Sequence, residues 1–267
     1  MSLLIRGATV IDGTGAPRRQ AAVAVAAGRI AAIGEDAAAT AGTGARTIDA
    51  GGLILAPGFI DLHSHADLTL PAFPGAINSL SQGVTTEVVG NCGFSPAPVA
   101  DSPERADLLR AYAAGLGPNL AWTWHSFDQF LETLDAAHPA VNVAPLVGHG
   151  TVRIAAMGMD DRPPTPTEQA TMQAGVREAL AAGAWGMSTG LVYPPGTYAA
   201  TDEIVALAAE LPKSGAFYAS HIRNEGGALL DAIGEAVSIG QQTGARVLCH
   251  SPKTLAVEAL AGGMKEA

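Results

Sequence analysis

The pattern of apolar and polar positions changes once along the chain, near residue 54. Before that point, short segments of alternating hydrophobicity are separated by glycine-rich turns such as 12–15 (DGTG), a pattern that is typical of a small antiparallel β layer. These segments lie at 3–11, 21–25, 29–33 and 47–49. We therefore predict a small, separate N-terminal β subdomain over residues 1–54.

From residue 55 onward, apolar or β-branched runs alternate with longer stretches of helical periodicity. The runs that we predict as strands lie at 54–62, 84–91, 141–148, 183–190, 216–221 and 245–250. Helix starts are visible in the capping boxes at 126–129 (SFDQ) and 165–168 (TPTE). Such alternation favours a parallel sheet, and a closed barrel has eight strands. The prediction is an α/β fold with an incomplete TIM-like barrel, six of eight βα units, over residues 55–267.

Composition and charge exclude some partners. The chain is 48% hydrophobic and 15% charged, as expected for a globular protein with a large core. A net charge of −10 argues against nucleic acid and anionic membranes as partners, because both attract positive surfaces. The N-terminus shows no secretory signal and no apolar run is long enough to span a membrane, so we expect a cytoplasmic protein.

Several histidines and a cysteine stand at the ends of predicted strands. His63 and His65 follow the first run, and alternation along a strand would place both on one face. Cys92, His221 and His250 follow later runs, and the C-terminal ends of barrel strands converge on one face. Three such ligands suit a catalytic zinc ion, with His63 and His65 holding a second metal or completing the pocket. Taken singly, His221 and His250 are each equally well explained as a hydrogen-bonded core residue, and an isolated His-x-His pair usually lies at the surface. The other cysteine, Cys249, points away from His250 and is expected in the core.

Five separate motifs resemble one known family. They are 57–67 (PGFIDLHSHAD), 83–93 (GVTTEVVGNCG), 147–150 (VGHG), 183–193 (GAWGMSTGLVY) and 220–225 (SHIRNE). Together they resemble the D-aminoacylase, or N-acyl-D-amino-acid deacylase, family of the amidohydrolase superfamily. The resemblance covers nearly the whole chain, with the motifs in the order of the family.

The resemblance implies zinc-dependent hydrolysis of N-acyl-D-amino acids, small-molecule substrates, in a TIM-like barrel flanked by a small β-sandwich. It implies a tightly held Zn²⁺ on Cys92, His221 and His250, with His63 and His65 as the paired histidines. It also implies a lysine that holds the substrate carboxylate, for which Lys253 is the candidate, one residue further from His250 than in the family pattern. The general-base aspartate of the family would follow the eighth strand, beyond residue 267, so the catalytic base is unknown unless Asp67 or Glu87 supplies it.

Three further residues each have two interpretations. Tyr193 could donate a hydrogen bond to a developing oxyanion, or pack against the following prolines. Arg223 could bind a substrate carboxylate, or form a salt bridge with Glu225 or another acid. His149 could line the site, or support it from behind.

Two other functions remain open on the sequence. One is a ring-opening amidohydrolase of the dihydroorotase or hydantoinase type, although those relatives commonly use a carboxylated lysine where this chain has Cys92. The other is a truncated, catalytically impaired metal-binding fragment, which would self-associate through the open barrel edge.

Overall fold

The computed structural model describes residues 2–118 and 120–250. The chain divides into two compact units, Met1–Phe59 and Ile60–Ala267, whereas we predicted the division after residue 54. Lys253 lies outside the described residues.

The N-terminal unit contains one five-stranded sheet and a short helix. Its strands pair in the order β3-β2-β1-β4, with β5 also paired to β1. Their bounds are β1 Ser2–Val10, β2 Arg19–Ala26, β3 Arg29–Ile33, β4 Arg46–Asp49 and β5 Ile54–Leu55, with α1 at Ala37–Ala41. Because α1 returns the chain after β3, β4 pairs parallel to β1, and so does β5. The described part of this unit is thus a mixed sheet with a helix against it, which corrects the predicted antiparallel arrangement of its strands.

The predicted strand at 54–62 is two strands. β5 belongs to the N-terminal sheet, while β6 (Phe59–Asp61) joins the sheet of the second unit. The break falls at Pro57 and Gly58, where proline has no backbone N–H to donate to a ladder.

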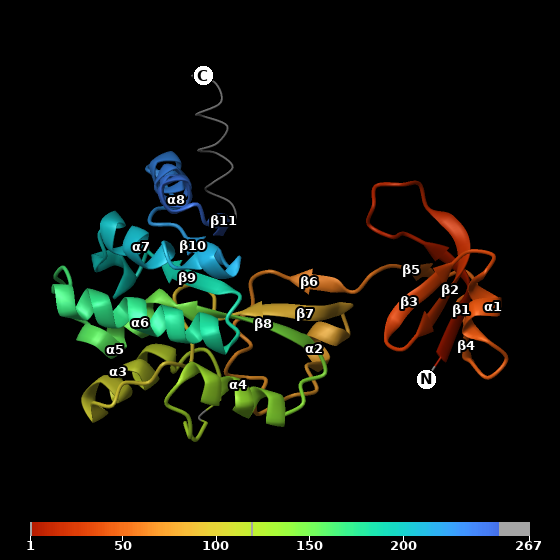
Figure 1. The fold of residues 1–267 in the computed structure, drawn as a ribbon, viewed down its shortest axis with the longest axis horizontal. Helices are drawn as coiled ribbons and strands as arrows, with labels where there is room; N and C mark the ends of the chain where they lie inside the picture. Colours follow the sequence, from red (N-terminus) through yellow and green to blue (C-terminus); the bar gives the residue numbers. More distant parts are fainter. Residues whose placement is uncertain (1, 119, 251–267) are drawn as a thin grey trace. The chain divides into compact units, whose positions relative to one another are not determined.

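The second unit is built on a six-stranded sheet in which the strands follow one another in chain order (Figure 1). After β6 come β7 Val84–Val89, β8 Asn142–Gly148, β9 Gly186–Gly190, β10 Phe217–His221 and β11 Arg246–His250. The pairs from β7 to β11 are parallel. The six predicted barrel strands are confirmed, and together they form an incomplete TIM-like barrel. Among the described residues, β6 and β11 each have a single neighbour in this sheet.

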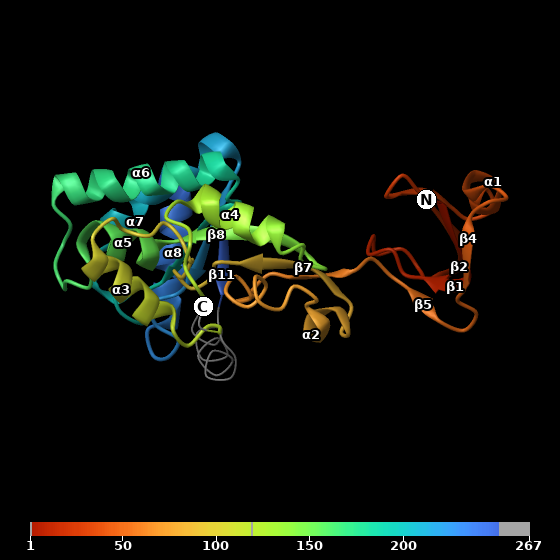
Figure 2. The same ribbon diagram turned by 90° about the horizontal axis from the view of Figure 1, so that it is seen from below.

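Helices cover this sheet, and two of them begin where the sequence predicts a start. They are α2 Ile77–Leu80, α3 Pro103–Ala113, α4 Phe127–Ala136, α5 His149–Met157, α6 Pro166–Ala182, α7 Thr201–Ala208 and α8 Leu229–Thr243, with 3₁₀ turns at Gly196–Tyr198 and Leu211–Ser214. Both predicted capping boxes are present, at Ser126 and Thr165. Helix α6 lies alongside α4 and α5 in both views (Figures 1 and 2). None of the described helices has the length and apolar character needed to cross a membrane.

The main core lies between these helices and the sheet. Its largest members include Phe127 and Phe130 of α4 and Met172 of α6, all essentially buried. Cys249, predicted as a core residue, is exposed instead. It lies on β11, which has only β10 beside it among the described strands, so this prediction is wrong because an edge strand is not enclosed on both sides.

Candidate metal centre

The loops after β6 and β7 bring three candidate ligands together. The ligand atoms of His63, His65 and Cys92 all lie within 4.8 Å of one another, and Cys92 Sγ is 3.2 Å from His63 Nε2. β6 ends at Asp61, so the two histidines lie in the turn beyond the strand. Asp61 accepts a hydrogen bond from the backbone N–H of His63 at 3.0 Å, which shapes this turn. The turn, rather than the alternation of a strand, places both imidazoles beside the thiol.

A fourth ligand comes from β10. His221, the last residue of that strand, places Nδ1 3.3 Å from Cys92 Sγ, and its Nε2 lies 2.7 Å from Glu225 Oε1. In the parallel β10–β11 pair, His250 is the register partner of His221. The strand order therefore brings the backbone of His250 to the same end of the sheet as the other four.

The backbone at Cys92 is strained. Its φ is +56°, in the left-handed region that residues with a Cβ rarely adopt, at a cost of about 1–3 kcal/mol. The flanking Gly90 and Gly93 also have positive φ. A Cβ on Gly90 would collide with the carbonyl oxygen of Leu146, so only glycine allows the loop to pass so close to β8. The loop can hold Cys92 in this conformation only because its surroundings fix it.

Burial shifts the pKa values of two candidate ligands in opposite directions. Burial, reinforced by the charges of His63 and His221, lowers the pKa of His65 to about 4, so its imidazole is neutral near pH 7. Burial also raises the pKa of the Cys92 thiol, which a hydrogen bond with Tyr193 partly opposes and the charge of Glu225 reinforces. A bound metal cation would supply the positive charge that stabilises the thiolate.

The residues fit zinc. One thiol with several imidazoles is the nitrogen and sulfur donor set that zinc prefers. In addition, Nδ1 of His65 is buried and has no hydrogen-bond partner among the described atoms. A buried nitrogen without a partner is costly, and a metal ion would satisfy it.

Tyr193 lies beside this cluster. Its ring meets the His221 imidazole edge to face, with centroids 5.6 Å apart, and its hydroxyl donates to the carbonyl oxygen of Cys92. The tyrosine therefore contacts two of the candidate ligands. Its predicted role toward a substrate oxyanion stays a prediction.

Arg223 is held by an acid on α8. Its Nε and Nη2 lie 2.9 and 2.8 Å from the two carboxylate oxygens of Glu235, and Nη2 also donates to the carbonyl oxygen of Ala199. The structure thus shows the salt-bridge interpretation, with Glu235 in place of Glu225. Contact with a substrate carboxylate stays a prediction and would have to compete with this pair.

His149 is fully buried behind the site. Its Nε2 lies 2.8 Å from Glu203 Oε1, and the same oxygen accepts a hydrogen bond from Arg153 Nε at 3.1 Å. His149 is the first residue of α5 and Glu203 lies in the first turn of α7, so the network joins two helix starts. The sequence analysis missed Glu203, because an acidic residue in the first turn of a helix is ordinarily exposed.

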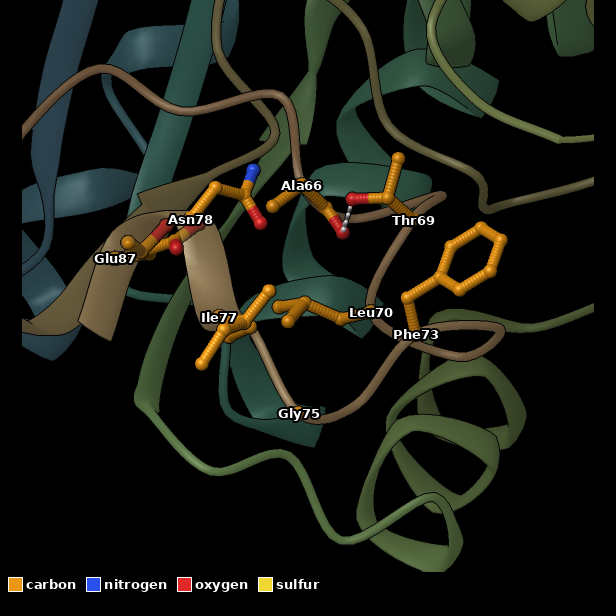
Figure 3. A pocket seen from close by; sticks show the side chains of 10 residues that line it. Ala66, Thr69, Leu70, Phe73, Gly75, Ile77, Asn78 and Glu87 are labelled. Carbon is orange, nitrogen blue, oxygen red and sulfur yellow. Dashed lines mark hydrogen bonds between the residues drawn. The ribbon is translucent and has the colours of Figure 1, made fainter. Parts of the chain in front are cut away.

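The two acids proposed as substitute bases are not members of the ligand cluster. Asp67 is buried, which raises the pKa of its carboxyl to about 7, partly offset by backbone hydrogen bonds. Glu87 accepts a hydrogen bond from Ser64 Oγ at 2.6 Å and lines a pocket of about 540 Å³, where it lies near Asn78 and across from Phe73 (Figure 3). Neither is among the ligand atoms grouped within 4.8 Å.

Comparison with known proteins shows the family to which the chain belongs. The model of the amidohydrolase family matches residues 46–261. The chain belongs to the amidohydrolase family.

Among its relatives, an N-acyl-D-aspartate deacylase of Alcaligenes xylosoxydans xylosoxydans is 46% identical over 248 residues, 92% of this chain and 48% of that protein. A crystal structure of D-aminoacylase superposes with a TM-score of 0.82 at 42% identity, over 93% of this chain and 51% of the other. The structure of an N-acyl-D-glutamate deacylase from Bordetella bronchiseptica, complexed with zinc and a phosphonate inhibitor, superposes with a TM-score of 0.81 at 39% identity. The match covers 98% of this chain and 55% of the other. The resemblance to D-aminoacylases is confirmed, and this amidohydrolase spans about half the length of these relatives.

Proposed function

We propose that this amidohydrolase hydrolyses the amide bond of N-acyl-D-amino acids, releasing a carboxylate and a D-amino acid. The observation that carries the proposal is the Cys92 thiol, with imidazole nitrogens of His63 and His221 3.2 and 3.3 Å away at the C-terminal end of the sheet. The chain is similar to deacylases over about half of their length, and this similarity supports the choice of substrate. A cysteine at this strand end argues against the ring-opening alternative, which uses a carboxylated lysine there.

We assign the zinc ligands as Cys92, His221 and His250, with His63 and His65 completing the centre. When bound, zinc supplies Lewis acidity, which activates water and polarises a carbonyl group. The imidazole of His65, neutral near pH 7, is ready to ligate without losing a proton. Glu225 Oε1 lies 2.7 Å from His221 Nε2, and the other ring nitrogen of His221, Nδ1, faces the thiol.

The remaining residues bind and orient the substrate. Tyr193 already donates to a carbonyl oxygen beside the ligands, so its hydroxyl is placed to donate to a developing oxyanion in exchange for that bond. Lys253 is proposed to hold the carboxylate. The Arg223–Glu235 pair fixes the segment that follows β10. Hydrolysis also needs a group to accept a proton from water and pass one to the leaving amine, and we assign none within the described residues.

We also propose that the protein acts in the cytoplasm. A cysteine ligand must remain a free thiol until metal binds, and a reducing compartment keeps it so.

The test is a set of paired assays on zinc-loaded protein. N-acetyl-D-aspartate, N-acetyl-D-glutamate, their L enantiomers and a cyclic diamide are offered to the wild type and to Cys92→Ala. The proposal expects hydrolysis of the D substrates alone, with loss in the variant. Equal rates on both enantiomers, or turnover of the cyclic amide alone, would contradict it. Tight zinc binding without turnover of any substrate would favour the metal-binding fragment.

A further inference from the structure

One buried side chain from another strand holds the Cys92 loop on both sides. Ser188 lies in the middle of β9 and is completely buried. Its Oγ accepts a hydrogen bond from the backbone N–H of Gly93 at 2.9 Å and donates one to the carbonyl oxygen of Gly90. These two backbone groups bracket Cys92, so a single hydroxyl spans the strained part of the loop.

The loop that carries Cys92 lies against the backbone of β8 and β9 at positions occupied by glycine. A Cβ on Gly190 would collide with the carbonyl oxygen of Cys92, and one on Gly148 would collide with the carbonyl of Gly93. The ends of β8 and β9 are therefore glycine where they meet the loop. Ser188 is the residue of β9 whose side chain reaches the backbone on either side of Cys92.

The conformation that this hydroxyl stabilises is the one that presents the thiol. Cys92 has φ of +56°, and rotation to the extended region would redirect its Cα–Cβ bond. Sulfur would then leave the positions 3.2 Å from His63 Nε2 and 3.3 Å from His221 Nδ1. Without the Ser188 hydroxyl, the Gly90 carbonyl and Gly93 N–H lose their common partner in a buried place, which favours rearrangement of the loop.

We propose that Ser188 is a positioning residue for the metal centre, which sets the Cys92 thiol in place before metal binds. The inference deepens the proposed function and rests on it, because it requires Cys92 to be a metal ligand. Residues that orient a ligand without touching the metal commonly change metal affinity by about 10–100-fold when they are removed.

The test measures cobalt binding, since Co²⁺ reports thiolate ligation through a charge-transfer band in the near ultraviolet. Wild type, Ser188→Ala and Cys92→Ala are compared by the intensity of this band and by Co²⁺ and Zn²⁺ affinity in competition with a chelator. The matched control is Thr189→Val, the next residue of β9. Its hydroxyl is equally buried but bonds to Tyr218 Oη and Ser220 Oγ instead of the loop.

We expect Ser188→Ala to bind both metals about 10–100-fold more weakly with a weakened or shifted thiolate band, and Thr189→Val to stay within about threefold of wild type. Wild-type affinity and band in folded Ser188→Ala would overturn the role of Ser188. Loss of affinity in Thr189→Val as large as in Ser188→Ala would also overturn it, because any buried hydroxyl of β9 would then have the same effect.

Two further variants keep the outcome decisive. If Ser188→Ala does not fold, Ser188→Cys takes its place, because a thiol of similar size is a weaker hydrogen-bond partner, and unchanged affinity would again refute the proposal. The double variant Cys92→Ala/Ser188→Cys shows whether the new thiol itself binds cobalt. A wild-type band in Cys92→Ala would instead overturn the metal centre, and with it the proposed function.

Discussion

Replacing Glu203 with glutamine should destabilise the protein far more than breaking an exposed ion pair. Glu203 Oε1 lies 3.1 Å from Arg153 Nε and 2.8 Å from His149 Nε2, and the Arg153 and Glu203 side chains are 0% and 3% exposed. The other Arg153 nitrogens donate to the carbonyl oxygens of Asp160 and Arg162. Glu203 is thus the one carboxylate shown paired with this buried guanidinium among the described residues.

The expected loss follows from the geometry. At a separation of 3.1 Å and an effective dielectric constant of about 20, the two charges attract by about 5 kcal/mol. Glutamine keeps an acceptor oxygen and part of that attraction, so we expect Glu203→Gln to lower the free energy of unfolding by about 3 kcal/mol. Asp107→Asn is the control. Its partner Arg110 is 2.8 Å away but the two side chains are 77% and 43% exposed, so the loss should be below about 0.5 kcal/mol.

Urea unfolding followed by tryptophan fluorescence at pH 7 measures both values. Burial raises the pKa of Glu203, but hydrogen bonds and charges from His149 and Arg153 lower it by more. The net effect is a pKa below the usual value of a glutamate. A carboxyl with a lowered folded pKa stabilises the protein above its unfolded pKa of about 4.3, and this contribution is lost as the pH falls toward the folded pKa. The difference between wild type and Glu203→Gln should therefore be constant above about pH 5 and shrink below about pH 4. Equal losses in the two variants at pH 7, or a difference independent of pH down to acid unfolding, would refute the reasoning.

Three further outcomes are expected. After dialysis against a mild chelator, metal analysis should find about one zinc per chain in the wild type and much less in Cys92→Ala; equal contents would remove Cys92 from the site. In size-exclusion chromatography the protein should elute above its 26.9 kDa monomer mass and bind a hydrophobic dye, because Ile60 in β6 and Leu62 just after it are 60% and 49% exposed, and β6 has a single neighbour among the described strands; a monodisperse monomer without dye binding speaks against this. Glu235→Gln should lower the free energy of unfolding by about 1 kcal/mol, because the Arg223 side chain is 30% exposed and solvent screens the pair. Thermal or urea unfolding at pH 7 measures this loss. A loss equal to that of Glu203→Gln would be inconsistent with the difference in burial between the two pairs.

The sequence by itself determined the elements and the kind of chemistry. Most barrel strands are local runs of apolar or β-branched residues, and the helix starts at Ser126 and Thr165 depend on side chains within three residues of each other. The candidate ligands could be found because parallel strands bring their C-terminal ends to one face of a barrel, so Cys92 and His221 could be expected to meet across 129 residues of chain.

Tertiary structure alone decided how these parts are held. The partners of Arg223 and His149 come from α8 and α7, and nothing local in the sequence selects Glu235 or Glu203 from the other acids. The exposure of Cys249 depends on which strand lies beside β11. The hydroxyl of Ser188 finds its partners 95 and 98 residues away, on either side of the positive φ at Cys92. Local periodicity indicates which face of a helix or strand is buried. Which side chain packs against that face depends on contacts between elements that are distant along the chain.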